Sequence, residues 1–123
     1  MLRFSATNDG KLLDTLSREI FGDEFPGKVG YVLYDGDKAI GVAKMTVGTE
    51  VSVLERVGIV PEERKKGNGD FFTRSLIFGM SNASEEVVVN TKDEYYCKFG
   101  FTERNGKMVC PSGRVVFPCG CHK

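Results

Sequence analysis

The segment that most constrains the fold is VGIVPEERKKGNGDFF, from Val57 to Phe72. An apolar, strand-forming run stops at Pro61, which cannot donate a hydrogen bond to a sheet. Three consecutive cations and a Gly-Asn-Gly sequence follow, and then a segment with the composition of a helix begins. The first backbone N–H groups of a helix have no internal partner, and the helix dipole adds positive potential there. The segment therefore predicts a phosphate site, against the alternative of a solvated charged turn.

Length and composition predict one domain with an ordinary core, because the chain has 123 residues, of which 41% are hydrophobic and 28% charged. The formal net charge is zero, whereas nucleic-acid-binding proteins usually carry a basic excess. No apolar run approaches the roughly 20 residues of a membrane span. The start, MLRFSATNDG, lacks the apolar segment of a signal peptide. We therefore expect a cytoplasmic protein with neither a nucleic-acid nor a membrane partner.

Local patterns predict an α+β fold with a mixed, mostly antiparallel sheet flanked by helices. The segment 8–22 reads as a helix that Asn8 or Asp9 caps and Gly22 ends. Asp35-Gly36 is typical of the tight turn of a β-hairpin within 28–45. The other predicted elements are strands at 1–7, 51–60, 85–91, 101–110 and 113–119, a helix at 69–82 and a short helix at 92–100. The strand at 101–110 contains a turn or bulge at Asn105-Gly106.

Two motifs resemble those of the GNAT superfamily of N-acetyltransferases. The string IVPEERKKGNG is similar to the family's pyrophosphate-binding motif, in which a strand ending in V-x-P runs into R-x-x-G-x-G/A and a helix. The matching positions are Ile59, Pro61, Arg64, Gly67 and Gly69. Downstream, YYCKFGF, which starts at Tyr95, resembles the family's F-Y-x-K-x-G-F segment. With the order of elements, the resemblance covers nearly the whole chain and predicts the GNAT-like fold.

The resemblance implies a single N-acetyltransferase domain over residues 1–123. Its donor would be acetyl-CoA, and its acceptor a small-molecule or peptide primary amine that attacks the thioester directly. The diphosphate would lie on the backbone N–H groups of residues 64–69, and the pantetheine arm along the strand that ends at Val60. The implied CoA-binding residues are Gly58, Ile59, Val60, Arg64, Lys65, Lys66, Gly67, Asn68, Gly69, Asn90 and Tyr96.

Two residues are candidates for proton transfer. Tyr96 matches the family tyrosine and is interpreted as the acid that protonates the departing thiolate, against the alternative of a tyrosine that only packs. Glu55, on the strand leading into the motif, is the candidate base. The alternative for Glu55 is a surface carboxylate paired with Arg56, and Arg56 is also a candidate to line an acceptor pocket.

The sequence also departs from the family pattern. The segment DEFPGK is short, so a second helix that usually helps to shape the acceptor pocket is reduced or missing. Family members often carry an asparagine seven residues before the tyrosine, whereas this chain has Val89 at that position and Asn90 one residue later. The alternative function is therefore a non-catalytic module that binds CoA or acyl-CoA. The resemblance also admits a homodimer, because dimers are frequent in the family and exposed final strands can pair.

The end of the chain is rich in potential metal ligands, namely Cys110, Cys119, Cys121 and His122. Three thiols and an imidazole can bind zinc, which would make a zinc-stabilised interaction module. Their spacing differs from the C-x2-4-C pairs of common structural sites. We therefore expect no metal, reduced thiols and an exposed tail histidine. Cys97, beside Tyr96, is read as a free thiol as well.

Overall fold

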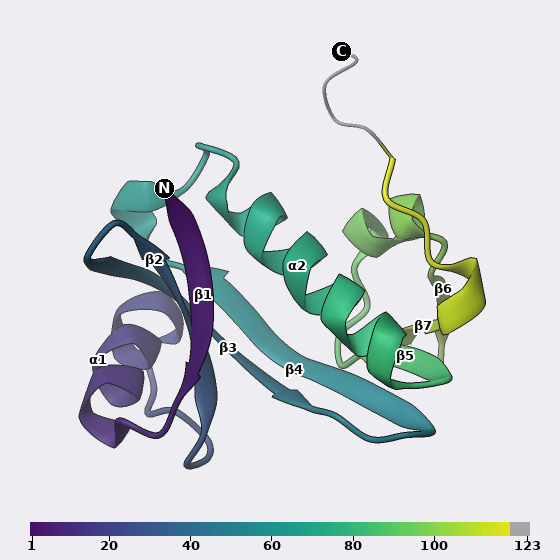
Figure 1. Cartoon of the computed structure of the whole chain (residues 1–123), viewed down its shortest axis with the longest axis horizontal. Helices are drawn as coiled ribbons and strands as arrows, with labels where there is room; N and C mark the ends of the chain where they lie inside the picture. Colours follow the sequence, from purple (N-terminus) through teal and green to yellow (C-terminus); the bar gives the residue numbers. More distant parts are fainter. Residues whose placement is uncertain (119–123) are drawn as a thin grey trace. The chain divides into compact units, whose positions relative to one another are not determined.

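The computed structural model describes residues 1–118 (Figure 1). In chain order the elements are β1 (Leu2–Thr7), α1 (Gly10–Phe21), β2 (Gly30–Asp35), β3 (Lys38–Thr46), β4 (Val51–Ile59), the 3-10 helix η1 (Pro61–Glu63), α2 (Asn68–Ala83), β5 (Glu86–Val89), the 3-10 helix η2 (Glu94–Phe99), β6 (Thr102–Arg104), β7 (Lys107–Pro111) and the 3-10 helix η3 (Ser112–Arg114). The strands follow one another in the sheet as β1-β2-β3-β4-β5-β7-β6. Strand β4 pairs with β5 in parallel, and the pairs β1–β2, β2–β3, β5–β7 and β6–β7 are antiparallel. The predicted fold class is confirmed.

The chain divides into two compact units. Unit 1 consists of residues 1–45 and 56–75, and unit 2 of residues 46–55 together with 76 onward. Strand β4 and helix α2 each contribute residues to both units. None of the helices in the described part of the chain is long and apolar enough to cross a membrane.

Unit 1 is built on α1 and the first three strands. The side chain of Asp9 accepts a hydrogen bond from the Leu12 N–H at 3.2 Å and so caps α1, while Gly22 ends it in the left-handed region at φ 85°. These are the predicted caps. The helix buries an apolar stripe that includes Leu13, whose Cδ2 lies 2.7 Å from where a Cβ on Gly30 of β2 would stand. Glycine at position 30 therefore allows α1 to pack closely on the sheet.

Unit 2 is built on β5, β7 and the short helix η2. Register pairs Val87 with Cys110 and Val88 with Val109, so the two strands form a continuous antiparallel ladder. Four aromatic rings form a cluster whose neighbouring centroids lie 5.1–6.5 Å apart. Tyr95, Tyr96 and Phe99 belong to η2, and Phe101 lies between η2 and β6. Such edge-to-face contacts fix the rings against one another.

The turn predicted at Asn105-Gly106 is confirmed, whereas the last predicted strand is not found. Asn105 and Gly106 adopt positive φ values of 54° and 82° and form a tight turn, so the segment 101–110 folds as a hairpin of β6 and β7. The strand expected at 113–119 is absent from its described part, residues 113–118, and Cys119 lies outside the described residues. Ser112–Arg114 form a 3-10 turn after Pro111, which the Val115 N–H closes by donating to the Ser112 carbonyl at 3.3 Å. The Val116 N–H then donates to the Phe99 carbonyl at 3.0 Å.

Candidate functional site

The phosphate loop predicted from the sequence lies between η1 and α2 in unit 1. Lys65 and Gly67 both take positive φ values, 64° and 83°, so the chain turns sharply before the helix. A Cβ at Gly67 would meet no atom within 4 Å, so glycine is needed there for its backbone angle, and the space beside it is open. The Asn68 side chain donates to the Glu63 carbonyl at 3.0 Å and ties the two ends of the loop together.

The loop presents a run of unpaired backbone donors. Among the described residues, the N–H groups of residues 65–69 donate to no acceptor, whereas the Phe71 N–H donates to the Gly67 carbonyl at 3.0 Å. The Arg64 N–H donates to the Pro61 carbonyl at 3.3 Å and is therefore already used. Successive N–H groups in a turn with left-handed residues form a concave anion site. The loop thus has the backbone geometry that a phosphate requires.

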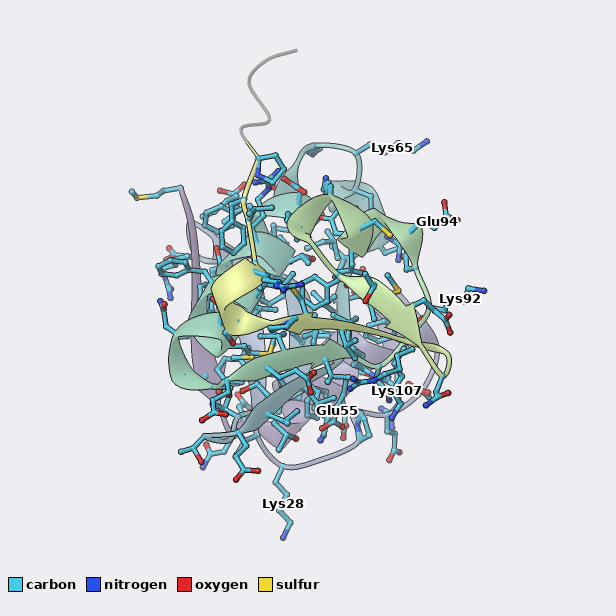
Figure 2. All side chains as sticks on the ribbon, turned by 90° about the vertical axis from the view of Figure 1, so that its right-hand side faces the viewer. Lys28, Glu55, Lys65, Lys92, Glu94 and Lys107 are labelled. Carbon is cyan, nitrogen blue, oxygen red and sulfur yellow. The ribbon has the colours of Figure 1, made fainter. Side chains whose placement is uncertain are left out.

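The cations of the loop have different partners. The Arg64 Nε donates to the Ile59 carbonyl at 2.8 Å, which pins the loop to the end of β4. Lys38 and Lys66 both pair with the Glu63 carboxylate, at 3.1 and 3.2 Å, and the hydrogen bonds from Lys38 and then Lys66 hold the pKa of Glu63 below its usual range. Lys65 has no partner among the described residues, and Figure 2 shows its side chain extending away from the ribbon. The positive charge of the loop is therefore only partly offset.

The end of β4 supplies the predicted pantetheine-binding residues. The Val60 N–H donates to the Ile40 carbonyl at 2.9 Å, so it is not available to a thioester oxygen. Gly58 packs under the last turn of α1, because a Cβ there would stand 2.5 Å from Ile20 Cγ2 and 2.9 Å from Phe21 Cζ. The resemblance implies that the thioester carbonyl meets a backbone N–H of Gly58, Ile59 or Val60, and of these the Val60 N–H is already used.

Tyr96 lies in η2 of unit 2 and is buried except at its hydroxyl. Its residue is 5% exposed, and three aromatic rings surround it. The hydroxyl has no hydrogen-bond partner among the described residues. Every buried side-chain oxygen in the described part of the chain does have a partner, so this hydroxyl is not buried and reaches solvent. Burial, helped by the Asp93 carboxylate, raises the pKa of Tyr96 to about 12. A rigid, protonated hydroxyl is thus directed to the surface of the unit.

Glu55 and Arg56 point to different partners. Glu55, in unit 2, accepts a hydrogen bond from Thr46 Oγ1 at 2.5 Å. Arg56, in unit 1, pairs with Asp23 at 2.9 Å, and its guanidinium lies 4.6 Å from the centroid of the Phe21 ring. The interpretation of Glu55 as a carboxylate paired with Arg56 is therefore wrong. Arg56 is instead held against α1.

The remaining predicted residues of unit 2 have structural contacts. The Asn90 N–H donates to the Leu54 carbonyl at 2.9 Å, just beyond the last paired residues of β4 and β5, and its side chain is exposed. Cys110 is buried, which raises the pKa of its thiol, and Cys97 is exposed. Residues 1–118 contain no cluster of three or more His, Cys, Asp or Glu side chains suited to a metal. Cys119, Cys121 and His122 lie outside the described residues.

The structure also contains a pocket whose lining residues the sequence patterns do not indicate as a site. A pocket of about 420 Å³ in unit 2 has two cations at its edge, Arg104 and Lys107. The only sequence signal was the Asn-Gly turn with a cation on each side, which indicates a hairpin but no site. The pocket depends on strand register, and local sequence does not reveal register.

Comparisons with known proteins identify the fold. Neither a scan of known protein families nor a search of curated proteins finds a match. Among solved structures, the chain is similar to the ribosomal-protein-S18-alanine N-acetyltransferase from Escherichia coli, with a TM-score of 0.74 at 14% identity over 100% of this chain and 99% of the other. A GNAT family acetyltransferase from Brucella melitensis in complex with acetyl-CoA gives a TM-score of 0.72 at 12% identity, over 90% of this chain and 88% of the other.

A third similar structure is the GNAT family N-acetyltransferase YhbS from Escherichia coli in complex with CoA, with a TM-score of 0.69 at 15% identity over 91% of this chain and 81% of the other. The chain therefore has the fold of the GNAT acetyltransferases, as its two motifs predict. At these identities the similarity is one of fold.

Proposed function

We propose that the protein is an N-acetyltransferase that transfers the acetyl group of acetyl-CoA to a primary amine, and that it acts in the cytoplasm. The observation that carries the proposal is the run of five unpaired N–H groups at residues 65–69, at the start of α2, in a GNAT fold. A diphosphate fits this run, because phosphate oxygens accept hydrogen bonds from successive backbone amides and are favoured by a helix N-terminus. The unpaired cation of Lys65 adds to the attraction.

Positioning accounts for most of the proposed catalysis. Bound acetyl-CoA supplies an acetyl thioester, which is already reactive toward a neutral amine. Holding two reactants in line can contribute roughly 7–11 kcal/mol to lowering the barrier. In the proposal, a backbone N–H at Gly58 or Ile59 donates to the carbonyl oxygen as it gains negative charge. The loop and the end of β4 therefore bind and orient, and side chains transfer the protons.

Tyr96 is the proposed acid for the departing thiolate. Three features support it: the ring is held by its aromatic neighbours, the hydroxyl reaches solvent, and a pKa of about 12 keeps the hydroxyl protonated at every physiological pH. The proposal requires this hydroxyl to reach the sulfur of the thioester. Glu55, oriented by its hydrogen bond from Thr46, is the proposed base that accepts a proton from the ammonium.

A thiol-release assay with a panel of amines tests the proposal. We expect turnover with at least one amine, and we expect Tyr96→Phe to lower kcat by about 100-fold or more while the Kd of acetyl-CoA stays the same. Tyr95→Phe is the matched control, because Tyr95 belongs to the same helix and aromatic cluster, and it should keep its activity. Acetyl-CoA binding with no turnover of any amine would instead support the non-catalytic CoA-binding module.

A further inference from the structure

The pocket in unit 2 has an apolar floor made by one row of the sheet. Register pairs Val53 of β4 with Val88 of β5, and Val88 with Val109 of β7. Residues that lie directly opposite one another on neighbouring strands share a face, so the three valines form a continuous apolar strip. The pocket measures about 420 Å³ and is lined by Val53, Val88, Arg104, Asn105, Lys107 and Val109. This size is within the usual range for small-molecule sites.

The rim of the pocket is cationic and comes from the β6–β7 hairpin. Arg104 and Lys107 are paired across the turn, so both side chains project to the same face. Glu103 precedes Arg104 by one residue, so its side chain projects to the opposite face of the strand. Its carboxylate accepts a hydrogen bond from the Gly106 N–H at 2.7 Å. The hairpin therefore presents two cations to the pocket and directs its own carboxylate elsewhere.

The net charge at the rim is close to one positive unit. Arg104 has a partner, because its guanidinium lies 3.5 Å from the Glu86 carboxylate. Lys107 has none among the described residues. Figure 2 shows Lys107 at the end of the hairpin, with Glu55 of β4 in the same lower region of the view. One ammonium group thus lacks a counter-charge beside an apolar strip, and a carboxylate complements this arrangement.

We propose that this pocket binds the carboxylate end of the acceptor, so that the acceptor is an amino acid whose amine and carboxylate lie at opposite ends of a short apolar chain. The inference rests on the proposed function, in which Glu55 is the base. Glu55 follows Val53 by two residues on β4, which puts it on the same face of the strand roughly 7 Å further along. The amine then lies toward Glu55, the methylene groups cover the valines, and the carboxylate pairs with Lys107 and Arg104.

Matched acceptors that differ only in the carboxylate test the inference. 6-Aminohexanoate is compared with 6-aminohexanamide, and kcat/KM for the acid should exceed that for the amide by about tenfold or more. Lys107→Met should bring this ratio close to one, because it retains the aliphatic stem and removes the charge. Lys92→Met, at an exposed lysine of the same unit, is the control and should leave the ratio unchanged. Equal kcat/KM values for acid and amide, or an unchanged ratio in Lys107→Met, would overturn the inference.

A binding experiment separates failure of this inference from failure of the proposed function. Nuclear magnetic resonance of ¹⁵N-labelled protein follows the backbone amides of residues 104–109 during titration with 6-aminohexanoate. Saturable shifts with the acid and none with the amide support the pocket even if no acetyl transfer is found. If acetyl transfer proceeds with neutral amines but these amides do not shift, the proposed function stands and the inference is wrong.

Discussion

Replacing Gly58 by alanine probes how closely β4 is packed against the last turn of α1. The added Cβ would stand 2.5 Å from Ile20 Cγ2 and 2.9 Å from Phe21 Cζ, whereas carbon atoms in contact prefer roughly 3.5–4.0 Å. The methyl group therefore intrudes by about 1 Å. Overpacking of this kind costs roughly 1–3 kcal/mol, so we expect Tm to fall by roughly 4–12 °C in a chain of this size.

Urea denaturation of matched variants measures this effect. Gly79→Ala is the control, because Gly79 lies inside α2 and a Cβ there meets nothing within 4 Å. It should stabilise the protein by roughly 0.5–1 kcal/mol through its helix propensity. Ile20→Ala removes the clashing methyl group, so it should cost less in the Gly58→Ala background than alone. A Gly58→Ala protein as stable as the parent, or strictly additive effects of Gly58→Ala and Ile20→Ala, would refute the packing argument.

Three further predictions concern pH and capping. Because burial raises the pKa of Tyr96 to about 12, kcat should show no alkaline decline up to about pH 10. If kcat does decline below about pH 10 and Tyr96→Phe abolishes this decline, the assignment is contradicted. The hydrogen bond from Arg56 holds the pKa of Asp23 below its ordinary 3.8, so the pair stabilises the fold above pH 3.8, and this contribution is lost as the pH falls from there through the lowered pKa. Arg56→Gln should therefore make stability less dependent on pH between about 5 and 3, and an unchanged acid dependence would count against the pair. Asp9→Ala removes the cap of α1 and should cost about 1 kcal/mol in urea denaturation, whereas no loss would mean that the cap is not needed.

The sequence was informative wherever structure is decided locally. The caps Asp9 and Gly22, the turn at Asp35-Gly36 and the strand end at Pro61 all follow from backbone preferences of single residues, and each was predicted. The glycine-containing loop before α2 follows from the Gly-Asn-Gly sequence between a strand and a helix, and the structure adds that Gly67 takes a positive φ of 83°.

Features that depend on packing were not predicted. The run Val115–Phe117 is apolar and contains two β-branched valines, but it forms no strand. The Phe117 ring instead lies 5.9 Å from that of Phe99 in η2 and 6.1 Å from that of Phe78 in α2, between ring centroids. Tertiary contacts thus replace the strand that its composition predicts. The partner of Arg56 is Asp23, 33 residues away, which no local pattern indicates. The valine row of the pocket likewise depends on the register of three strands.

The measurement that tests the central claim most directly is calorimetric titration of the purified protein with acetyl-CoA, S-acetylpantetheine and ATP. If residues 65–69 bind the diphosphate, acetyl-CoA should bind saturably, in preference to ATP, and at least roughly tenfold more tightly than S-acetylpantetheine, which lacks the diphosphate. Gly67→Val should weaken acetyl-CoA binding, whereas Gly22→Val, which places the same side chain at a comparable φ with equally open surroundings, should not. Equal affinity for acetyl-CoA and S-acetylpantetheine, or no binding of acetyl-CoA at millimolar concentration, would contradict the account.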